Sequence, residues 1–504
     1  MNNPRWLESR EIVERIIIRG NLVLETPAYF GSGDHDEIVG ISLDLDPLEG
    51  RTLLTGASLA GALRSYLREC EHGFGKQGGD KKSLYMNLFG NHENDEGEQS
   101  FLIVNDSLGE KPKIELRDGI KIDGKTRTAK DKGKFDFELI EAGACFPIEI
   151  ELLLPPREEK RKEKLLLGLA IALRGLEKGE ISLGFRKRRG FGRCRIKEWN
   201  GVKGWNVCRY DLTTPKGLID WLNLDKGEEK SGQNILTLLG ISESELLDKR
   251  CIFQMDATFS LDGSMIIRSG YDEVNAPDTV HLHSKRNDES VPVLSGTSLA
   301  GALRARAFRI ANTIQNSTTT SKDNKKAREM INNLFGPEIE KPEDKAFASK
   351  LITAETEIIN PPLKLVQQRI KIDRFTGSSF PTALFDEQPV FEQSGTKVKL
   401  KVQIQKPDNA QIGLLLLLLK DLWTRDLPLG GEASIGRGRL IGQEAELSYK
   451  MEGPNYQEWK LKQKYNGKLE IVGDREKLEG FVNNFVSNFS EEIQHDTRGL
   501  KAKM

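Results

Sequence analysis

The sequence predicts an α+β protein built from two tandem ferredoxin-like modules, each with the RRM-like order βαββαβ and a hairpin insertion. Three observations predict this fold. Four short motifs occur twice in the same order, the strand and helix patterns around them match in both halves, and 504 residues are too many for one ordinary domain.

The repeat is clearest in a glycine-rich segment that leads into a helical pattern. Residues 53–64 read LLTGASLAGALR, and residues 293–304, 240 positions later, read VLSGTSLAGALR. Three shorter motifs recur at offsets of 246 to 250 residues: NLFG at 87–90 and 333–336, IKID at 120–123 and 370–373, and GFGR at 190–193 matched by GRGR at 436–439. This order and spacing indicate a tandem duplication.

Each half contains the elements that the fold needs. Ser58 and Ser298 are the predicted N-caps of the first helices, and the small residues Ala60, Gly61 and Ala62 predict close packing of the first helix on a sheet. Each copy begins with a strand, at 12–24 and 251–261, and a helix follows the short apolar run that ends in G-[AT]-S-L. Then come a hairpin at 118–138 and 369–387, a strand at 146–154 and 397–404, a second helix at 161–177 and 410–423, and a closing strand.

The repeat also divides the chain. We expect a first module at residues 1–210, a bridge at 211–249, a second module at 250–450 and a C-terminal extension at 451–504.

Composition limits the classes of function. Lys and Arg number 75 against 76 Asp and Glu, so the net charge of −1 argues against indiscriminate coating of nucleic acid, and any contact must use local clusters. Five scattered cysteines without a CxxC pair fit a reducing cytosol and give no support for structural zinc. Without a signal core or a membrane-length apolar run, we expect a cytoplasmic protein with no membrane partner.

The strongest cationic cluster is the loop at 185–195, which places six cations and two glycines among eleven residues. Glycines let backbone N–H groups approach phosphate oxygens, and arginine donates two parallel hydrogen bonds to phosphate. The predicted RNA contacts are Arg186, Lys187, Arg188, Arg189, Arg193 and Arg195. The matching loop at 430–439 keeps Arg437 and Arg439 and is predicted to bind more weakly. A solvated basic hairpin is the alternative.

Two further regions could bind phosphate. The helix starts at Ser58 and Ser298 offer free N–H groups beside a hydroxyl, with Arg64 and Arg304 further along each helix, although ordinary capping explains the serines equally well. The polar hairpins supply Lys125, Arg127 and Lys130 in the first half, and Arg369, Lys371 and Arg374 in the second. For these side chains the alternative is an unstructured surface loop.

The G-[AT]-S-L-A-G-A-L-R segment, paired twice with a late Gly/Arg-rich loop, resembles the repeat-associated mysterious protein (RAMP) superfamily of CRISPR systems, over roughly 12–200 and 250–445. The resemblance implies two RAMP domains whose hairpins act as thumbs, in a chain similar to the fused backbone subunits of the type III-D branch. The implied partners are crRNA, complementary target RNA and other effector subunits. Thr55 and Ser295 depart from the family, which often has Pro there, and the polymerase signature GGDD is absent.

The resemblance also implies chemistry. In catalytic members an aspartate between the first strand and the helix start cleaves target RNA with a divalent metal, here expected to be Mg²⁺, without an organic cofactor. The best match is Asp278, with Asp272 as its alternate. In the first half Asp36 is preferred over Asp34, and Asp278 and Asp36 are the expected metal ligands. Aspartates in loops are equally often turn residues.

Three functions therefore stay open. The first is a guide-RNA scaffold that also cuts target RNA, with up to one active site per copy. The second is the same scaffold without catalysis. The third is a metal-independent endoribonuclease that trims precursor guide RNA, a reaction that is also found among ferredoxin-like pairs.

Overall fold

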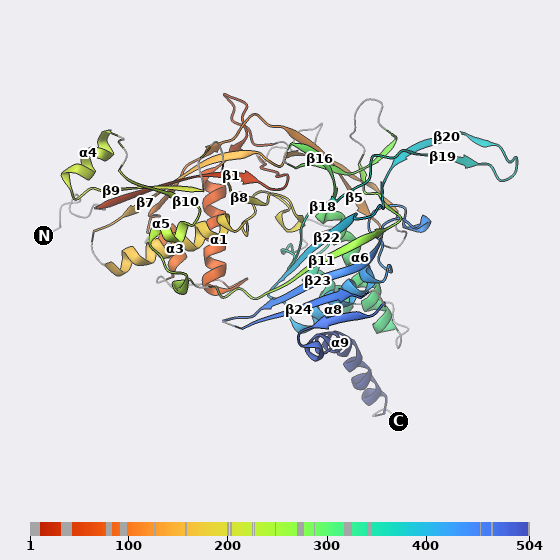
Figure 1. Ribbon diagram of the computed structural model, residues 1–504. Helices are drawn as coiled ribbons and strands as arrows, with labels where there is room; N and C mark the ends of the chain where they lie inside the picture. The colour runs from red at the N-terminus through yellow and green to blue at the C-terminus, as the bar shows by residue number, and fades with distance from the viewer. Residues whose placement is uncertain are drawn as a thin grey trace.

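The structure is a computed structural model. It describes residues 11–31, 43–76, 83–90, 98–124, 126, 128–156, 159–198, 201, 204–223, 225, 227–246, 248–269, 277–286, 288–316, 325–339, 345–453, 455–464 and 467–501. Two modules lie side by side, and each is an antiparallel sheet with helices on one face (Figure 1). The prediction of a tandem ferredoxin-like α+β fold is confirmed.

The sheet of the first module has β1 near its centre. Its path runs β10 (Glu228–Gly232), β9 (Trp205–Asp211), β1 (Glu14–Leu24), β7 (Cys145–Leu154), β3 (Leu102–Val104), and β8 (Cys194–Ile196) pairs with the end of β1. This is the 4-1-3-2 strand order of βαββαβ, with β8 and β9 sharing the role of the fourth strand. The core lies between this sheet and helices α1 (Gly56–His72), α2 (Leu84–Phe89) and α3 (Glu159–Glu177).

The second module repeats this order. Strand β11 (Ile252–Asp262) lies between β22 (Lys397–Gln405) and β23 (Arg439–Lys450), and β17 (Leu351–Thr353) and β18 (Thr356–Ile359) pair with β22. Alternate residues of β22 are buried, as expected for a sheet with one covered face. The covering helices are α6 (Gly296–Asn316), α7 (Lys325–Phe335) and α8 (Asn409–Trp423).

Both modules also contain short strands and, outside the main sheet, a hairpin. The hairpins are β5 (Ile114–Ile122) with β6 (Ala129–Ile140), and β19 (Gln367–Ile372) with β20 (Ser379–Gln388). The IKID motif ends at their turns, where Asp123 and Asp373 accept hydrogen bonds from the backbone N–H groups of Thr126 and Phe375 at 2.8 Å each. The remaining short elements are β2 (Leu53–Leu54), β4 (Ser107–Leu108), β12 (Ser264–Met265), β13 (Arg268–Ser269), β14 (Thr279–His281), β15 (His283–Arg286), β16 (Glu289–Leu294), β21 (Val390–Phe391) and the 3-10 turns η2 (Lys187–Arg189), η3 (Glu243–Glu245) and η4 (Ala433–Ile435).

The segment 211–249 folds onto the first module. It forms α4 (Pro215–Asn223), β10 and α5 (Ile235–Leu239); β10 extends the first sheet, and Ile235 and Leu239 are buried in the first core. At the other end, β24 (Tyr456–Gln463) and β25 (Leu469–Val472) extend the second sheet. Helix α9 (Arg475–Lys501) then packs closely on α8, where Phe481 and Phe485 are buried.

The starts of α1 and α6 differ from the expectation. The N-caps are Thr55 and Ser295, whose hydroxyls accept from the backbone N–H groups of Ser58 and Ser298 at 3.3 and 3.2 Å, so both serines lie inside the first turn. The predicted reason for Gly61 is also wrong: a side chain there would meet nothing within 4 Å.

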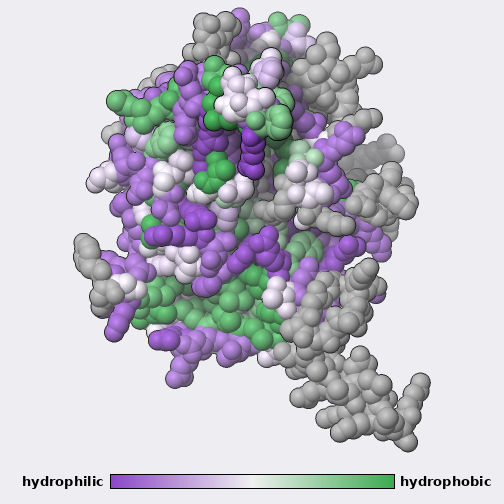
Figure 2. All heavy atoms as spheres, turned by 90° about the vertical axis from the view of Figure 1, so that its right-hand side faces the viewer, coloured by the Kyte–Doolittle hydropathy of each residue, from purple (hydrophilic) through white to green (hydrophobic). Residues whose placement is uncertain are grey.

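Helix α8 contains the leucine run and is apolar on nearly all sides, which fits a buried helix. Figure 2 shows apolar side chains gathered in a band across the lower part of the face that it presents, at the height of α8 and the start of α9. Among the described helices, none is both long and apolar enough to span a membrane.

A buried ion-pair network joins the modules. Arg117 of β5 donates to both oxygens of Glu355 at 2.9 and 3.2 Å, and also pairs with Glu115. Glu355, between β17 and β18, pairs with Arg286 of β15 at 2.6 Å. The side chain of Glu355 is 0% exposed. Burial alone would raise the pKa of this carboxyl, but the two guanidinium groups outweigh burial and lower it.

We predict that Glu355→Gln destabilises the protein by about 3 kcal/mol, because it leaves two buried guanidinium groups with one carboxylate fewer. The measurement is urea unfolding of the full chain. The matched control is Glu149→Gln, which breaks the exposed Arg19–Glu149 pair and should cost less than about 1 kcal/mol.

The same variant has a pH signature. Because the folded pKa of Glu355 lies below the unfolded value of about 4.3, its contribution is present above that value and lost as the pH falls through the folded pKa. The stability gap between wild type and Glu355→Gln should therefore be full at neutral pH and shrink under acid. A gap that grows under acid would contradict this assignment.

Candidate nucleic-acid interface

The two glycine-rich loops share one backbone conformation. Gly192 and Gly438 have φ values of 67° and 77°, and the backbone N–H groups of Leu183 and Leu429 donate to their carbonyls at 2.9 Å each. A side chain at either glycine would collide with the carbonyl oxygen of that leucine. Positive φ and close backbone approach both require glycine here, which explains why GFGR and GRGR recur.

The first glycine-rich loop, at residues 185–195, is held by aromatic rings at the base of the first hairpin. Arg186, in the left-handed region at φ 52°, places its guanidinium 4.8 Å from the ring centre of Phe135 and 5.1 Å from that of Phe137. Phe137 in turn contacts Phe191 edge to face at 5.9 Å. Burial lowers the pKa of Arg186. This predicted RNA contact is therefore partly used in cation–π packing within the module.

In the second module, ion pairs occupy the same place. The repeat aligns Phe137 with Glu387, Arg186 with Glu432 and Phe191 with Arg437. Arg437 is 3% exposed and pairs with Glu387 at 2.9 Å and with Glu432 at 3.0 Å. Arg369 pairs with the same two carboxylates at 3.1 and 3.5 Å. Arg437 is consequently enclosed and cannot reach an external phosphate, whereas Arg439 is exposed.

The first loop also docks on the second module. Arg189 donates to the carbonyl of Phe335 at 2.9 Å, and its own carbonyl lies so close to Gly296 that a side chain at this start of α6 would collide with it. Gly190 lies against the backbone of Glu355 in the same way. Burial, with Arg304 and Arg188 nearby, lowers the pKa of Arg189 to about 10. The predicted RNA-binding loop is thus also a structural joint.

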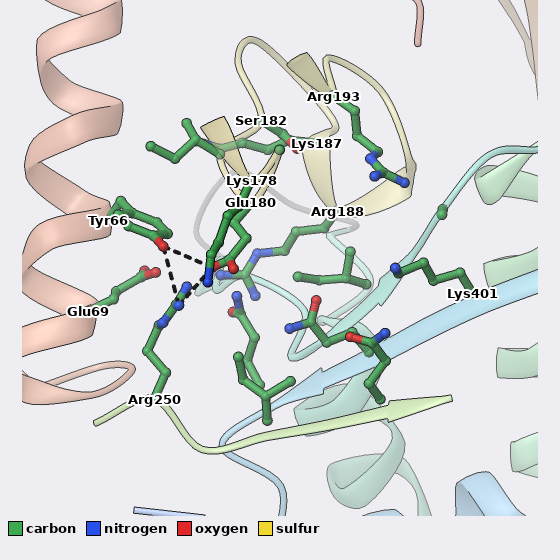
Figure 3. A pocket seen from close by; sticks show the side chains of 18 of the residues that line it. Tyr66, Glu69, Lys178, Glu180, Ser182, Lys187, Arg188, Arg193, Arg250 and Lys401 are labelled. Atoms are coloured by element: carbon green, nitrogen blue, oxygen red, sulfur yellow. Dashed lines mark hydrogen bonds and ion pairs between the residues drawn. The ribbon is translucent and has the colours of Figure 1, made fainter. Parts of the chain in front are cut away.

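The remaining cations of the loop, Lys187, Arg188, Arg193 and Arg195, line a cavity between the modules (Figure 3). Arg193 and Arg195 lie 3.6 and 3.3 Å from Glu25. Lys187 is exposed, and Arg188 is half-buried. The six cations of the cluster therefore point to three places, namely the hairpin base, the joint and the cavity.

The helix starts differ in access. Ser58, Gly61 and Arg64 are exposed on one side of α1. In α6, Ser298 is half-buried beneath the first loop. Arg304 donates at 2.7 Å to the carbonyl of Gly336 and at 2.7 Å to the side chain of Asn332. Arg304 therefore ties α6 to the NLFG motif, which ends α7.

The hairpins carry exposed cations. Lys130, Lys371 and Arg374 are exposed, and Lys371 lies 4.6 Å from the ring centre of Phe380. Phe375, at the second turn, is 97% exposed. Lys125 and Arg127 lie outside the described residues. Cations beside exposed aromatic rings suit contact with both the phosphates and the bases of RNA.

Of the four candidate catalytic aspartates, the structure describes Asp278. It is exposed, and its Oδ2 accepts from the backbone N–H of Asp386 at 3.0 Å, at the base of the second hairpin. Asp34, Asp36 and Asp272 lie outside the described residues. Nearby, His281 is fully buried with its pKa lowered to about 4 by burial, so it stays neutral and acts as a core hydrogen-bonding residue.

Within the described part of the chain, no group of three or more His, Cys, Asp or Glu side chains could hold a metal ion. Among the described residues, Asp278 is the candidate that would supply a carboxylate to a cation at this position. Mg²⁺ accepts such a site, because it keeps several waters and uses one or two carboxylates together with substrate phosphates.

Sequence reasoning missed the joint between the modules. Arg117 and Glu355 carry it, and the repeat places Gln367 where Arg117 would recur. The difference between Arg117 in the first copy and Gln367 at the matched position of the second could have indicated that this surface is buried in the first copy alone.

Comparison with known families supports the repeat. The model of the RAMP superfamily matches the chain twice, at residues 21–195 and 258–441. No curated protein matches the chain. The two matched segments cover more than half of the sequence and coincide with the two modules.

We predict that Gly192→Ala and Gly438→Ala each destabilise their module by more than about 1 kcal/mol, because the new side chain meets both a disfavoured φ and a carbonyl oxygen. Thermal unfolding measures this effect. The matched control is Gly61→Ala, where the added methyl meets nothing within 4 Å in a helix, so stability should rise by about 0.5–1 kcal/mol. A neutral result at Gly192 would contradict the close approach.

Proposed function

Because this chain belongs to the RAMP superfamily of CRISPR-associated RNA-binding proteins, we propose that it is a guide-RNA-binding backbone subunit of a type III effector complex. Its two modules would contact successive stretches of one crRNA, with target RNA paired to that guide and other effector subunits at either end.

The observation that carries this proposal is a pair of helix glycines that no other part of the described chain packs against. Gly61 and Gly301 lie at matched positions in α1 and α6, both exposed, and added side chains would meet no described atom within 4 Å. Glycine inside a helix costs about 1 kcal/mol relative to alanine. Nothing within the described chain uses the close approach that glycine permits. Approach of an RNA backbone would use it, in both modules at the same place.

Exposed positive charge on both modules supports the same conclusion. Arg64 is exposed one turn beyond Gly61, and the hairpins add Lys130, Lys371 and Arg374. The overall charge of −1 leaves these local cations as the attraction for phosphate. The buried Arg117–Glu355 pair fixes the spacing between the two modules.

We further propose that Asp278 takes part in metal-dependent cleavage of target RNA. Its exposed carboxylate is held by the backbone N–H of Asp386 at the base of the second hairpin. A bound Mg²⁺ would neutralise charge that develops on the phosphate as the neighbouring 2′-hydroxyl attacks. Asp278 would position that cation and could accept the hydroxyl proton.

We predict that Lys371→Gln with Arg374→Gln weakens binding of single-stranded RNA. The double change should also make the slope of log affinity against log salt less steep, reducing its magnitude by up to about 1.4, since each phosphate contact on a single strand contributes about 0.7. The measurement is fluorescence anisotropy with the full chain across a salt series.

The control for this experiment is Arg437→Gln. This side chain is enclosed by Glu387 and Glu432, so its loss should lower the unfolding temperature and leave the salt slope unchanged. If the two hairpin cations left the slope unchanged as well, the hairpin would not contact the phosphates.

We predict that Asp278→Ala, in a complex loaded with guide RNA, abolishes at least one of the discrete Mg²⁺-dependent cuts in a complementary target while guide RNA stays bound. Denaturing gels of labelled target, with Mg²⁺ or EDTA, measure the cuts. The matched control is Asp46→Ala, another aspartate that accepts backbone N–H groups in a loop, at 2.6 and 3.1 Å.

The alternatives give different patterns. A scaffold without catalysis would bind guide and target and make no cut with either protein. A precursor-processing endoribonuclease would cut precursor guide RNA in the presence of EDTA. Unchanged cutting by Asp278→Ala would remove this aspartate from the chemistry.

A further inference from the structure

A cavity of about 700 Å³ lies between the modules, and we propose that it binds a nucleotide through its phosphate (Figure 3). This site is separate from the hairpins and helix starts on which the proposed function rests.

The walls of the cavity come from both modules. The first supplies the outer side of α1, the segment after α3, and the basic loop. The second supplies the face of its sheet that no helix covers, where Gln254, Lys401, Gln403 and Gln405 alternate with core residues of β11 and β22. In Figure 3, Arg188 and Lys401 extend into the space from the loop and the sheet respectively.

The lining is strongly cationic. Three carboxylates, those of Glu69, Glu180 and Asp248, face eight cations: Lys178, Lys187, Arg188, Arg193, Arg195, Arg250, Lys401 and Lys450. Asp248 and Glu180 each pair with Arg250 at 2.7 Å, and Asp248 also pairs with Lys450. Of the other six cations, Arg193 and Arg195 pair with Glu25 behind the lining, and Lys401 lies 3.8 Å from Asp256.

Three of these cations lack a carboxylate within 4 Å in the described chain: Lys178, Lys187 and Arg188. Arg188 and Glu69 attract each other, but burial outweighs this attraction: it lowers the pKa of Arg188 and raises that of Glu69, so both groups are less favourable as ions here than in water. A half-buried guanidinium without a close anion is costly. A bound phosphate would supply the missing charge through two parallel hydrogen bonds.

The rest of the lining suits a base and a sugar. The side-chain amides of Gln254, Gln403 and Gln405 can donate and accept hydrogen bonds, as the edge of a base requires. Tyr456 is 56% exposed at the wall and offers a ring for stacking. The volume lies within the range of small-molecule sites and exceeds what one inorganic phosphate needs.

Among the described residues of the first module, the corresponding face of the sheet has no such surface. There Arg15 pairs with Glu151 at 2.8 Å and Arg19 with Glu149 at 2.6 Å, and Trp221 of α4 lies 4.2 Å from the guanidinium of Arg15. The uncovered cations therefore belong to the junction of the modules rather than to the repeated fold.

The nucleotide could be part of an RNA strand or free in solution, and the experiment separates the two sources. Full-length protein is treated with a lysine-acylating reagent alone, with ADP, or with a ten-nucleotide single-stranded RNA, and acylation is read by mass spectrometry. We expect a several-fold decrease at Lys178, Lys187 and Lys401 with at least one probe. Lys160 and Lys164, exposed on α3, should be unchanged.

The hairpin lysines keep this test independent of the proposed function. Lys130 and Lys371 report RNA on the hairpins. Protection there by RNA, with none in the cavity by either probe, would overturn the cavity proposal and leave the guide-RNA role standing. Protection by ADP in the cavity alone would support the site as one for a free nucleotide.

A variant pair links protection to the cavity itself. In Arg188→Gln with Lys401→Gln, protection of Lys178 and Lys187 should fall to near the level without probe. The matched charge change, Lys160→Gln with Lys164→Gln, should leave it intact. Thermal unfolding checks that both proteins fold. Full protection in a folded Arg188→Gln, Lys401→Gln protein would overturn the proposal.

Discussion

A single carboxylate sets how the two halves of this protein meet. Glu355 is buried between Arg117 from one module and Arg286 from its own, so neither guanidinium can move away without leaving charge unpaired in the interior. The docking of the first glycine-rich loop on α6, and the cavity beneath it, both depend on that placement. The ion pair fixes the relative orientation of the two modules, which non-directional apolar contact alone would not fix.

The two modules show how one backbone accommodates different chemistry. Both glycine-rich loops turn through the same positive φ values and the same backbone hydrogen bonds, yet the side chains beneath them are aromatic in the first module and charged in the second. The backbone tolerates both because glycine geometry, not side-chain packing, shapes the turn. The first hairpin contacts the neighbouring module, whereas the second extends away from the body of the protein (Figure 1).

The fold could be predicted because its signals are local or repeated. Alternating burial along β22 and the duplicated helix start lie within short stretches of sequence. The site was harder, since the loop cations look equivalent in sequence and diverge only through long-range contacts: Arg186 reaches Phe135, while Arg189 reaches Phe335. The capping role of Thr55 was missed because Ser58 is an equally good capping residue, and the helix start is decided by the strand before it.

The connection between the modules is short, and hydrogen bonds hold it to the first module. Between the end of α5 at Leu239 and the start of β11 at Ile252, Arg250 holds Asp248 and Glu180 and also reaches the hydroxyl of Tyr66 in α1. A tether anchored in this way suppresses swivelling. The covalent fusion therefore keeps the two modules at one constant distance, independent of the protein concentration.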